Sequence, residues 1–218
     1  MPDGRAGSVI RPAPSLTLRN EDNMSRIADI TRRTKETDIF LSLELDGSGE
    51  ANIETDIGFF DHMLSSFARH GFFNLECRAK GDLEVDVHHT IEDVGICLGE
   101  AIKEALAEKR GIRRFGDCIL PMDDALILVA LDLSGRPYFD FDCDFLTEKV
   151  GEFDTEMTKE FFYAVSYSAG MNLHIRKLAG SNSHHIIEAM CKAFGRALDQ
   201  ACGLDERVMG VPSTKGSL

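Results

Sequence analysis

A block of two adjacent histidines followed by a glutamate occurs twice in the chain and constrains the fold more than any other feature. The first copy is His88-His89-Thr90-Ile91-Glu92 and the second is His184-His185-Ile186-Ile187-Glu188, with 96 positions between their first histidines. Beyond the blocks, Gly99 matches Gly195 at the same offset. A match at a fixed offset indicates an internal duplication, so we expect two similar half-domains.

Each block opens a run with apolar residues at helical spacing, which predicts an amphipathic helix. Residues four apart share a helix face, so the first histidine and the glutamate of each block point the same way. The second histidine, His89 or His185, is turned about 100° away by the helical period. Each helix can therefore offer ligands in two directions.

Imidazole and carboxylate groups in this pattern suit manganese, iron or zinc, and no cysteine is placed to assist. One such pair on a helix usually belongs to a solvated face, but core packing gives no reason for four imidazoles at two helix starts. Each half offers one further candidate early in a helix, His62 in the first and Glu160 in the second. The pattern predicts two metal sites with four protein ligands each and open positions for a substrate. From the helix faces and the assumed symmetry, one site takes His62, His89, His184 and Glu188, and the other takes His88, Glu92, Glu160 and His185.

The composition argues against a nucleic-acid-binding protein and against a membrane protein. The formal net charge is −13 over 218 residues, which argues against nucleic-acid binding because that requires a basic face. The six cysteines are scattered, without a Cys-X-X-Cys pair, and fit core positions in a reducing compartment. Neither an apolar run of about 20 residues nor an apolar N-terminal segment is present, so a soluble cytoplasmic protein without a membrane partner is expected.

The order of patterns along the chain predicts an α+β fold in four segments. These are a disordered extension at 1–24, a first half-repeat at 25–112, a second at 113–205, and a C-terminal tail at 206–218. Strands are expected at 27–33, 37–45, 51–57, 73–79, 118–122, 125–133, 138–143 and 171–176, and helices at 59–70, 88–109, 155–169 and from 184. Gly71 is expected to cap the first helix and Ser183 to start the last. The run 125–131 is apolar on both faces, which predicts a central strand covered by helices.

Several motifs together resemble the imidazoleglycerol-phosphate dehydratase family of histidine biosynthesis. They are the two histidine blocks, Phe59-Phe60-Asp61-His62-Met63-Leu64, Leu133-Ser134-Gly135-Arg136-Pro137 and Pro212-Ser213-Thr214-Lys215-Gly216. The resemblance covers about residues 25–218. It implies two similar halves, each a mixed β-sheet backed by helices in a two-layer sandwich like ribosomal protein S5 domain 2. It also implies two Mn²⁺ per active site, and trimers assembled into a 24-subunit shell with active sites between subunits.

The reaction implied by the resemblance is the dehydration of imidazole glycerol phosphate to imidazole acetol phosphate. Two metals on the nitrogens would hold the ring as imidazolate, which helps to expel the neighbouring hydroxyl. The resemblance implies that Glu36 is the general base, and that cationic side chains bind the phosphate. The implied substrate contacts are Glu36, His62, His70, His88, Glu92, Arg114, Arg136, His184, Lys192, Ser213 and Lys215. Where this chain has Glu160, many relatives carry histidine as a ligand. Lys192 lies four residues after Glu188, so it should point toward the metal face.

Two other functions fit parts of the pattern. A dinuclear metallohydrolase acting on a small phosphate ester could use the same ligands, and cleavage of such an ester without formation of the ketone would favour it. A non-catalytic metal-storing or shell-forming protein would not need Glu36. His174 has no histidine partner in the repeat and is expected to be a structural, hydrogen-bonded side chain.

Overall fold

The first half of the chain forms three strands, which are followed by a helix, a fourth strand and a second helix. The computed structural model describes residues 26–216 and 218, so the extension expected at 1–24 lies outside the described residues. The elements of this half are β1 (Ile27–Arg33), β2 (Thr37–Glu44), β3 (Ala51–Glu54), α1 (Gly58–Gly71), β4 (Asn74–Gly81) and α2 (His88–Leu106).

The second half repeats this order. Its elements are β5 (Phe115–Met122), β6 (Ala125–Asp132), β7 (Tyr138–Asp142), α3 (Met157–Ala169), β10 (Asn172–Ala179) and α4 (Ser183–Cys202). A short hairpin of β8 (Lys149–Val150) and β9 (Phe153–Asp154), which the sequence patterns did not predict, is inserted before α3.

The two sheets have the same topology. Their strand orders are β1-β2-β4-β3 and β5-β6-β10-β7. In each sheet the first two pairings are antiparallel and the last, β3 with β4 or β7 with β10, is parallel. This shared topology confirms the predicted α+β class and is what a duplicated half-domain produces.

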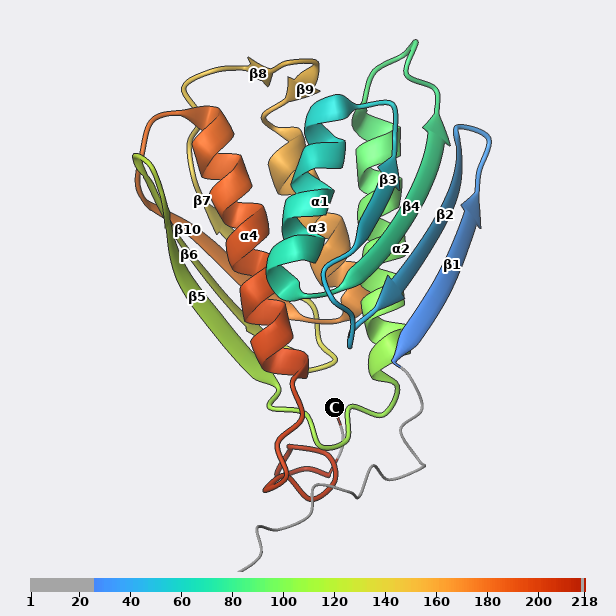
Figure 1. Cartoon of the computed structure of the whole chain (residues 1–218), viewed down its shortest axis with the longest axis vertical. Coiled ribbons are helices and arrows are strands. Elements are labelled where there is room, and N and C mark those ends of the chain that lie inside the picture. Colours follow the sequence, from blue (N-terminus) through green and yellow to red (C-terminus); the bar gives the residue numbers. More distant parts are fainter. Residues whose placement is uncertain (1–25, 217) are drawn as a thin grey trace, which may run out of the picture.

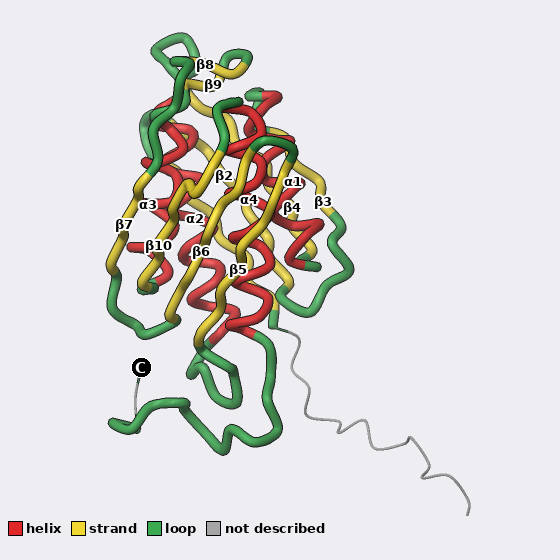
Figure 2. Tube along the Cα trace, turned by 90° about the vertical axis from the view of Figure 1, so that its left-hand side faces the viewer, coloured by secondary structure: helices red, strands yellow, loops and turns green. Residues whose placement is uncertain are grey.

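In the described part of the chain, four helices lie between the two four-stranded sheets (Figure 1). Helix α2 packs on β1 and β2, α4 packs on β5 and β6, and the halves meet where α1 contacts α4 and α2 contacts α3. Figure 2 shows the outer face of the second sheet, with helices behind it. Ile127 and Val129 of β6 are buried against these helices, whereas Leu126 and Leu128 are half-exposed on the outer face. The prediction of a central strand is confirmed, because β6 lies between β5 and β10, but among the described residues the helices cover only one of its faces.

Glycines let the helices of the two halves approach closely. A Cβ atom at Gly195 would lie 2.5 Å from the backbone oxygen of Phe67 in α1, and one at Gly99 would lie 2.6 Å from that of Val165 in α3. Both distances are below any normal carbon–oxygen contact, so each position excludes a larger side chain. The glycine match found in the sequence thus marks two equivalent helix crossings.

Helix α1 ends one residue later than predicted. Gly71 is its last helical residue, and Phe72 adopts the left-handed capping conformation with φ 57°. A Cβ atom at Gly71 would lie 2.9 Å from the backbone oxygen of Gly195. The ring of the buried Phe73 would lie closer still, so this glycine is required both by Phe73 and by the contact with α4, which the sequence pattern could not show.

The cysteines and the helix lengths also bear on the predictions from the sequence. All six cysteines are free, and four of them are buried, in agreement with their predicted role as small core residues. None of the helices in the described part of the chain is long and apolar enough to cross a bilayer.

Candidate metal centre

The four helices begin at the same end of the molecule (Figure 1). His62 lies in the second turn of α1, Glu160 lies in the first turn of α3, and the two histidine blocks open α2 and α4. All eight predicted ligands therefore lie at this end, which we call the ligand end.

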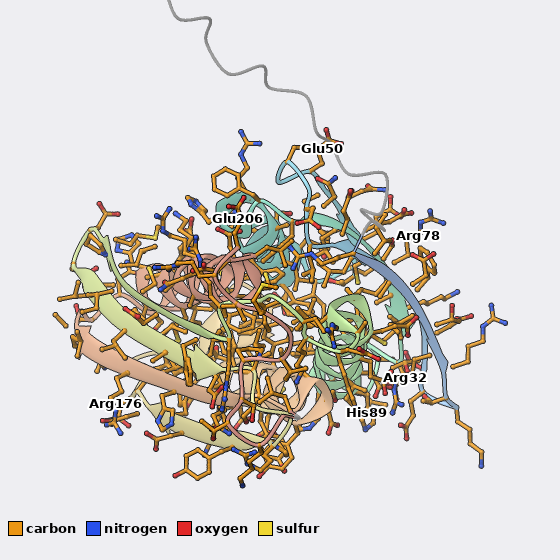
Figure 3. The ribbon with its side chains drawn as sticks, turned by 90° about the horizontal axis from the view of Figure 1, so that it is seen from below. Arg32, Glu50, Arg78, His89, Arg176 and Glu206 are labelled. Carbon is orange, nitrogen blue, oxygen red and sulfur yellow. The ribbon has the colours of Figure 1, made fainter. Side chains whose placement is uncertain are left out.

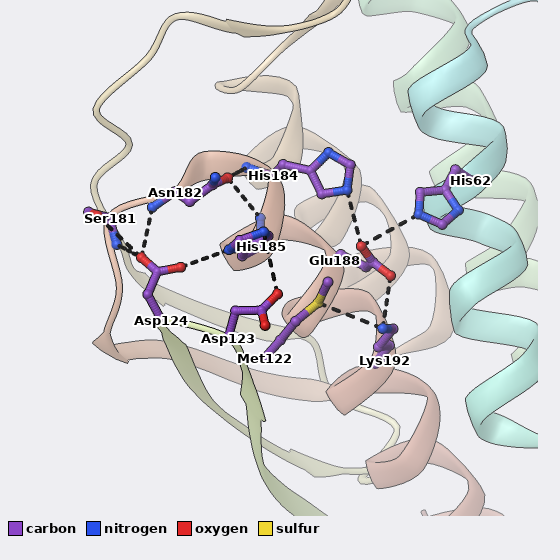
Figure 4. Close-up of polar contacts among 10 residues, drawn as sticks. All are labelled: His62, Met122, Asp123, Asp124, Ser181, Asn182, His184, His185, Glu188 and Lys192. Carbon is purple, nitrogen blue, oxygen red and sulfur yellow. Dashed lines mark hydrogen bonds and ion pairs between the residues drawn. The ribbon is translucent and has the colours of Figure 1, made fainter.

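Three of the predicted ligands meet in a cluster built by both halves (Figure 4). His184 Nε2 lies 3.1 Å and His62 Nε2 lies 3.5 Å from the same carboxylate oxygen, Oε2 of Glu188. One potential ligand atom from each residue lies within 4.8 Å of the other two. Donor atoms bonded to one ion at about 2.0–2.2 Å lie at comparable separations, so the cluster fits a single metal ion.

Glu188 is held as a carboxylate. Burial alone would raise its pKa, but the Lys192 ammonium and the imidazoles of His62 and His184 outweigh burial and lower the pKa. Lys192 Nζ lies 2.8 Å from the second carboxylate oxygen, Oε1, which confirms that Lys192 points toward this face. An ionised carboxylate is the form that a metal ion needs as a ligand.

Asn182, and not Ser183 as predicted, caps α4 and thereby fixes the second histidine block. Its side-chain oxygen accepts hydrogen bonds from the backbone N–H groups of His184 at 3.0 Å and His185 at 3.2 Å. The buried Ser183 hydroxyl instead accepts a hydrogen bond from Thr147. A residue in extended conformation just before the first turn is the usual cap, and Asn182 holds that position.

The second histidine of each block is turned away from the cluster, as the helical period predicts. His185 Nδ1 lies 2.8 Å from Asp124 of the β5–β6 turn. His89 Nδ1 lies 3.1 Å from Asp82, which directly follows β4. The hydrogen bond to Asp82 is the chief cause of a raised pKa at His89. Figure 3 shows His89, at the start of α2, near the edge of the molecule.

The predicted division of the ligands into two sites is only partly reproduced within one chain. His62, His184 and Glu188 come together, but His89 does not join them. In the other predicted set, His88 Nε2 lies 3.9 Å from Glu92 Oε2, and no second cluster of ligand atoms forms among residues 26–216. Because α4 packs on α1 whereas α2 packs on α3, His89 belongs to a different helix pair from His62, His184 and Glu188, and His185 to a different pair from His88, Glu92 and Glu160.

The predicted general base, Glu36, also lies at the ligand end. It is an exposed residue of the turn between β1 and β2, and its backbone N–H donates to the Thr34 hydroxyl at 3.0 Å. After the hydrogen bond to Asp82, the negative charge of Glu36 also helps to raise the pKa of His89.

His70 is half-buried in the last turn of α1, beside α4. Burial is the main cause of its lowered pKa, and the charges of Lys192 and Arg196 lower the pKa further. Of these predicted substrate residues, Lys192 is in direct contact with Glu188, at 2.8 Å. Arg196 is an additional neighbouring cation that the sequence analysis did not single out. It lies two helical turns beyond Glu188, so the helical spacing alone places Arg196 on the same face of α4 as Glu188.

The other predicted phosphate-binding residues lie at the opposite end. The backbone N–H of Arg114 donates to the oxygen of Ala201 in the last turn of α4, and its guanidinium binds Asp132 at 2.7 Å and the oxygen of Pro212. The helical rise places Ala201 roughly 25 Å from His184. Arg136 is exposed in the loop between β6 and β7, and Ser213 and Lys215 are in the tail that Arg114 contacts. One chain does not bring these residues to its own metal cluster.

His174 behaves as predicted for a structural side chain. It extends from β10, and its Nδ1 lies 3.3 Å from Asp140 of the neighbouring strand β7. Asp82, Asp124 and Asn182 form hydrogen bonds with the histidine blocks and were not predicted from the sequence. The contact between Asp124 and His185 spans 61 positions, and no local pattern shows such a pairing.

Known proteins resemble this chain in sequence and in fold. The family model described as imidazoleglycerol-phosphate dehydratase matches residues 55–198. The chain is 63% identical over 195 residues to the imidazoleglycerol-phosphate dehydratase of Lachnoclostridium phytofermentans, covering 89% of this chain and all of that protein. The enzyme of the same name from Acetivibrio thermocellus is 61% identical with the same coverage.

Solved structures give the same result. The crystal structure of imidazoleglycerol-phosphate dehydratase from Staphylococcus aureus aligns with a TM-score of 0.75 at 39% identity, covering 82% of this chain and 99% of that chain. The enzyme from Pyrococcus furiosus, in complex with (S)-C348, aligns with a TM-score of 0.75 at 39% identity, covering 87% and 100%. The identity over nearly the full length, the shared fold and the family motifs lead to one conclusion: the chain belongs to the imidazoleglycerol-phosphate dehydratase family.

Proposed function

We propose that this chain dehydrates imidazole glycerol phosphate to imidazole acetol phosphate, in histidine biosynthesis, with two Mn²⁺ ions per active site. The observation that carries the proposal is the cluster in which His62 of the first half meets His184 and Glu188 of the second. Family membership supplies the reaction, and the cluster supplies a reason for metal dependence.

The donor atoms fit manganese. Two imidazole nitrogens and one ionised carboxylate oxygen are acceptable ligands for this fairly hard ion. Three protein ligands leave coordination positions for the substrate and for a ligand from another subunit. When bound, the two ions would act as Lewis acids and hold the imidazole ring of the substrate.

Glu36 is proposed to take the proton from the substrate carbon. The exposed position of Glu36 on the β1–β2 turn leaves its carboxylate accessible at the ligand end. Lys192 and His70, near Glu188, are proposed to contact the substrate. A general base of this kind contributes about 10²–10⁴-fold to the rate, because it removes the proton as the carbon–hydrogen bond breaks.

We further propose that the active site is completed by other copies of the chain. Arg114 and the metal cluster lie at opposite ends of α4, roughly 25 Å apart. A small phosphate substrate therefore cannot contact both within one subunit. A neighbouring subunit could supply Arg114, Arg136, Ser213 and Lys215, and another block could supply the missing imidazole. The proposed assembly is a shell of 24 subunits built from trimers, as the family resemblance implies. The mass of the assembly, measured with and without Mn²⁺, tests this proposal.

The test is a measurement of metal content and turnover on the same preparation. We expect about two Mn²⁺ per subunit and loss of ketone formation after chelation, with recovery on adding Mn²⁺. His62→Ala should lose metal and turnover, whereas the matched variant His174→Ala, outside the cluster, should keep both. Absence of ketone formation by the Mn²⁺-loaded protein, with cleavage of a phosphate ester instead, would contradict the proposal and support a metallohydrolase.

A further inference from the structure

The second histidine of each block is held by an aspartate from a different loop in each half. His89 Nδ1 lies 3.2 Å and 3.1 Å from the two carboxylate oxygens of Asp82, in the segment between β4 and α2. His185 Nδ1 lies 2.8 Å from Asp124, in the turn between β5 and β6 (Figure 4). The same contact is thus made from two positions that the duplication does not relate.

This contact selects one tautomer of each ring. An ionised carboxylate has no proton to donate, so the imidazole Nδ1 must carry the proton and donate it. In the neutral ring, Nε2 then keeps its lone pair and is the atom free to bind a metal ion. His185 Nε2 faces the exposed Asp123 at 3.5 Å, a contact that an ion at Nε2 would replace.

The turn that holds Asp124 has a counterpart in the first half. Asp124 directly precedes β6, the second strand of its sheet, and Glu36 directly precedes β2, the second strand of the other sheet. In the second half the carboxylate of this turn is bound to the histidine. In the first half the equivalent turn carries Glu36, and the histidine is held by Asp82 instead.

We propose that Asp82 and Asp124 are positioning residues that fix the orientation and tautomer of His89 and His185 so that Nε2 is free to bind a metal ion, and that the use of Asp82 in the first half leaves Glu36 free as the base. This inference rests on the proposed function. It explains why one duplicated turn can hold a ligand in one half and carry the catalytic carboxylate in the other.

Asp82 offers the cleaner experiment. Its carboxylate forms hydrogen bonds only with His89 among the described residues, whereas Asp124 also accepts hydrogen bonds from the backbone N–H groups of Ser181 and Asn182. Glu84 is an exposed acid in the same loop, and its side chain makes no hydrogen bond or ion pair with any described residue, so Glu84→Ala is the matched control. Asp82→Asn keeps an acceptor oxygen but removes the charge.

The measurement is Mn²⁺ affinity by competition with a chelator, together with the tautomer of His89 read from the ¹⁵N shifts of the metal-free protein. We expect Asp82→Ala to weaken Mn²⁺ binding by about 10–100-fold and to lose the Nδ1-protonated form of His89. Asp82→Asn should show a smaller loss, and Glu84→Ala should match the wild type.

Two results would overturn the inference, and they are distinguishable. Wild-type protein that binds Mn²⁺, with Asp82→Ala and Asp82→Asn both within twofold of it, would refute the role of Asp82 and leave the proposed function standing. Wild-type protein that binds no Mn²⁺ would refute both. If Asp82→Ala does not fold, Asp82→Asn decides by the same twofold criterion.

Discussion

Thr37 donates its hydroxyl proton to Asp93 at 2.5 Å, across a sequence separation of 56. Asp93 is buried in the second turn of α2 and also accepts a hydrogen bond from Arg32 Nε at 2.7 Å. Thr37 directly follows Glu36, and Asp93 directly follows Glu92. This contact therefore ties the turn that carries the proposed base to the helix that carries the first histidine block.

Replacing Asp93 by Ala should lower the free energy of unfolding by about 2–3 kcal/mol, because Arg32 and the buried Thr37 hydroxyl both lose a charged partner. Urea unfolding of the metal-free protein measures the change. Asp38→Ala is the control in the same hairpin, since its ion pair with Arg33 at 3.0 Å is exposed and should contribute less than about 1 kcal/mol. Equal effects of the two variants would contradict a structural role for Asp93.

Replacing Gly195 by Ala should push α1 and α4 apart, because the new Cβ atom would lie 2.5 Å from the backbone oxygen of Phe67. Overpacking of this kind costs about 1–3 kcal/mol. The displacement also separates His62 from Glu188, so Mn²⁺ affinity should fall as well. At Gly58 no atom lies within 4 Å of an added Cβ, and Gly58→Ala should leave both properties unchanged. Wild-type Mn²⁺ affinity in Gly195→Ala would show that the cluster does not depend on this crossing.

Replacing Glu36 by Gln should reduce kcat by about 10²–10⁴-fold while Mn²⁺ content stays the same, because the amide cannot accept the carbon-bound proton. Steady-state turnover and metal analysis of the same sample check both parts. Glu84→Gln makes the same chemical change in an exposed loop and should keep full activity. Unchanged turnover in Glu36→Gln would favour a base elsewhere in the assembly.

Alkaline pH should destabilise the fold partly through Cys77. Burial raises the pKa of its thiol from 9.0 to about 12, and nearby Cys97 adds to the shift. The folded state therefore retains a proton that the unfolded chain loses above pH 9, so stability is present below pH 9 and falls as the pH rises toward 12. Urea midpoints at pH 8 and pH 10 should differ less in Cys77→Ala than in the wild type. An identical pH dependence in both proteins would show that this thiol does not contribute.

The duplication, the helix starts and the grouping of each first histidine with its glutamate could all be predicted from the sequence. They depend on spacing within one helix, which the helical period determines. His184 and Glu188 met as predicted, at 3.1 Å, for this reason. The cap of α4 was misplaced by one residue, because Asn182 and Ser183 are both good capping residues and only the backbone conformation distinguishes them.

The tertiary structure alone decided which segments meet. The packing of α1 on α4 brought His62 to Glu188, and the fold placed Asp82 and Asp124 against the second histidines. It also placed Arg114 roughly 25 Å from the cluster, at the far end of α4. Contacts of this kind join residues that are distant in sequence, so the periodicity of a single helix or strand cannot predict them. The sequence by itself determined which groups were available and which way each helix presents them, whereas the packing of helices between two sheets decided their partners.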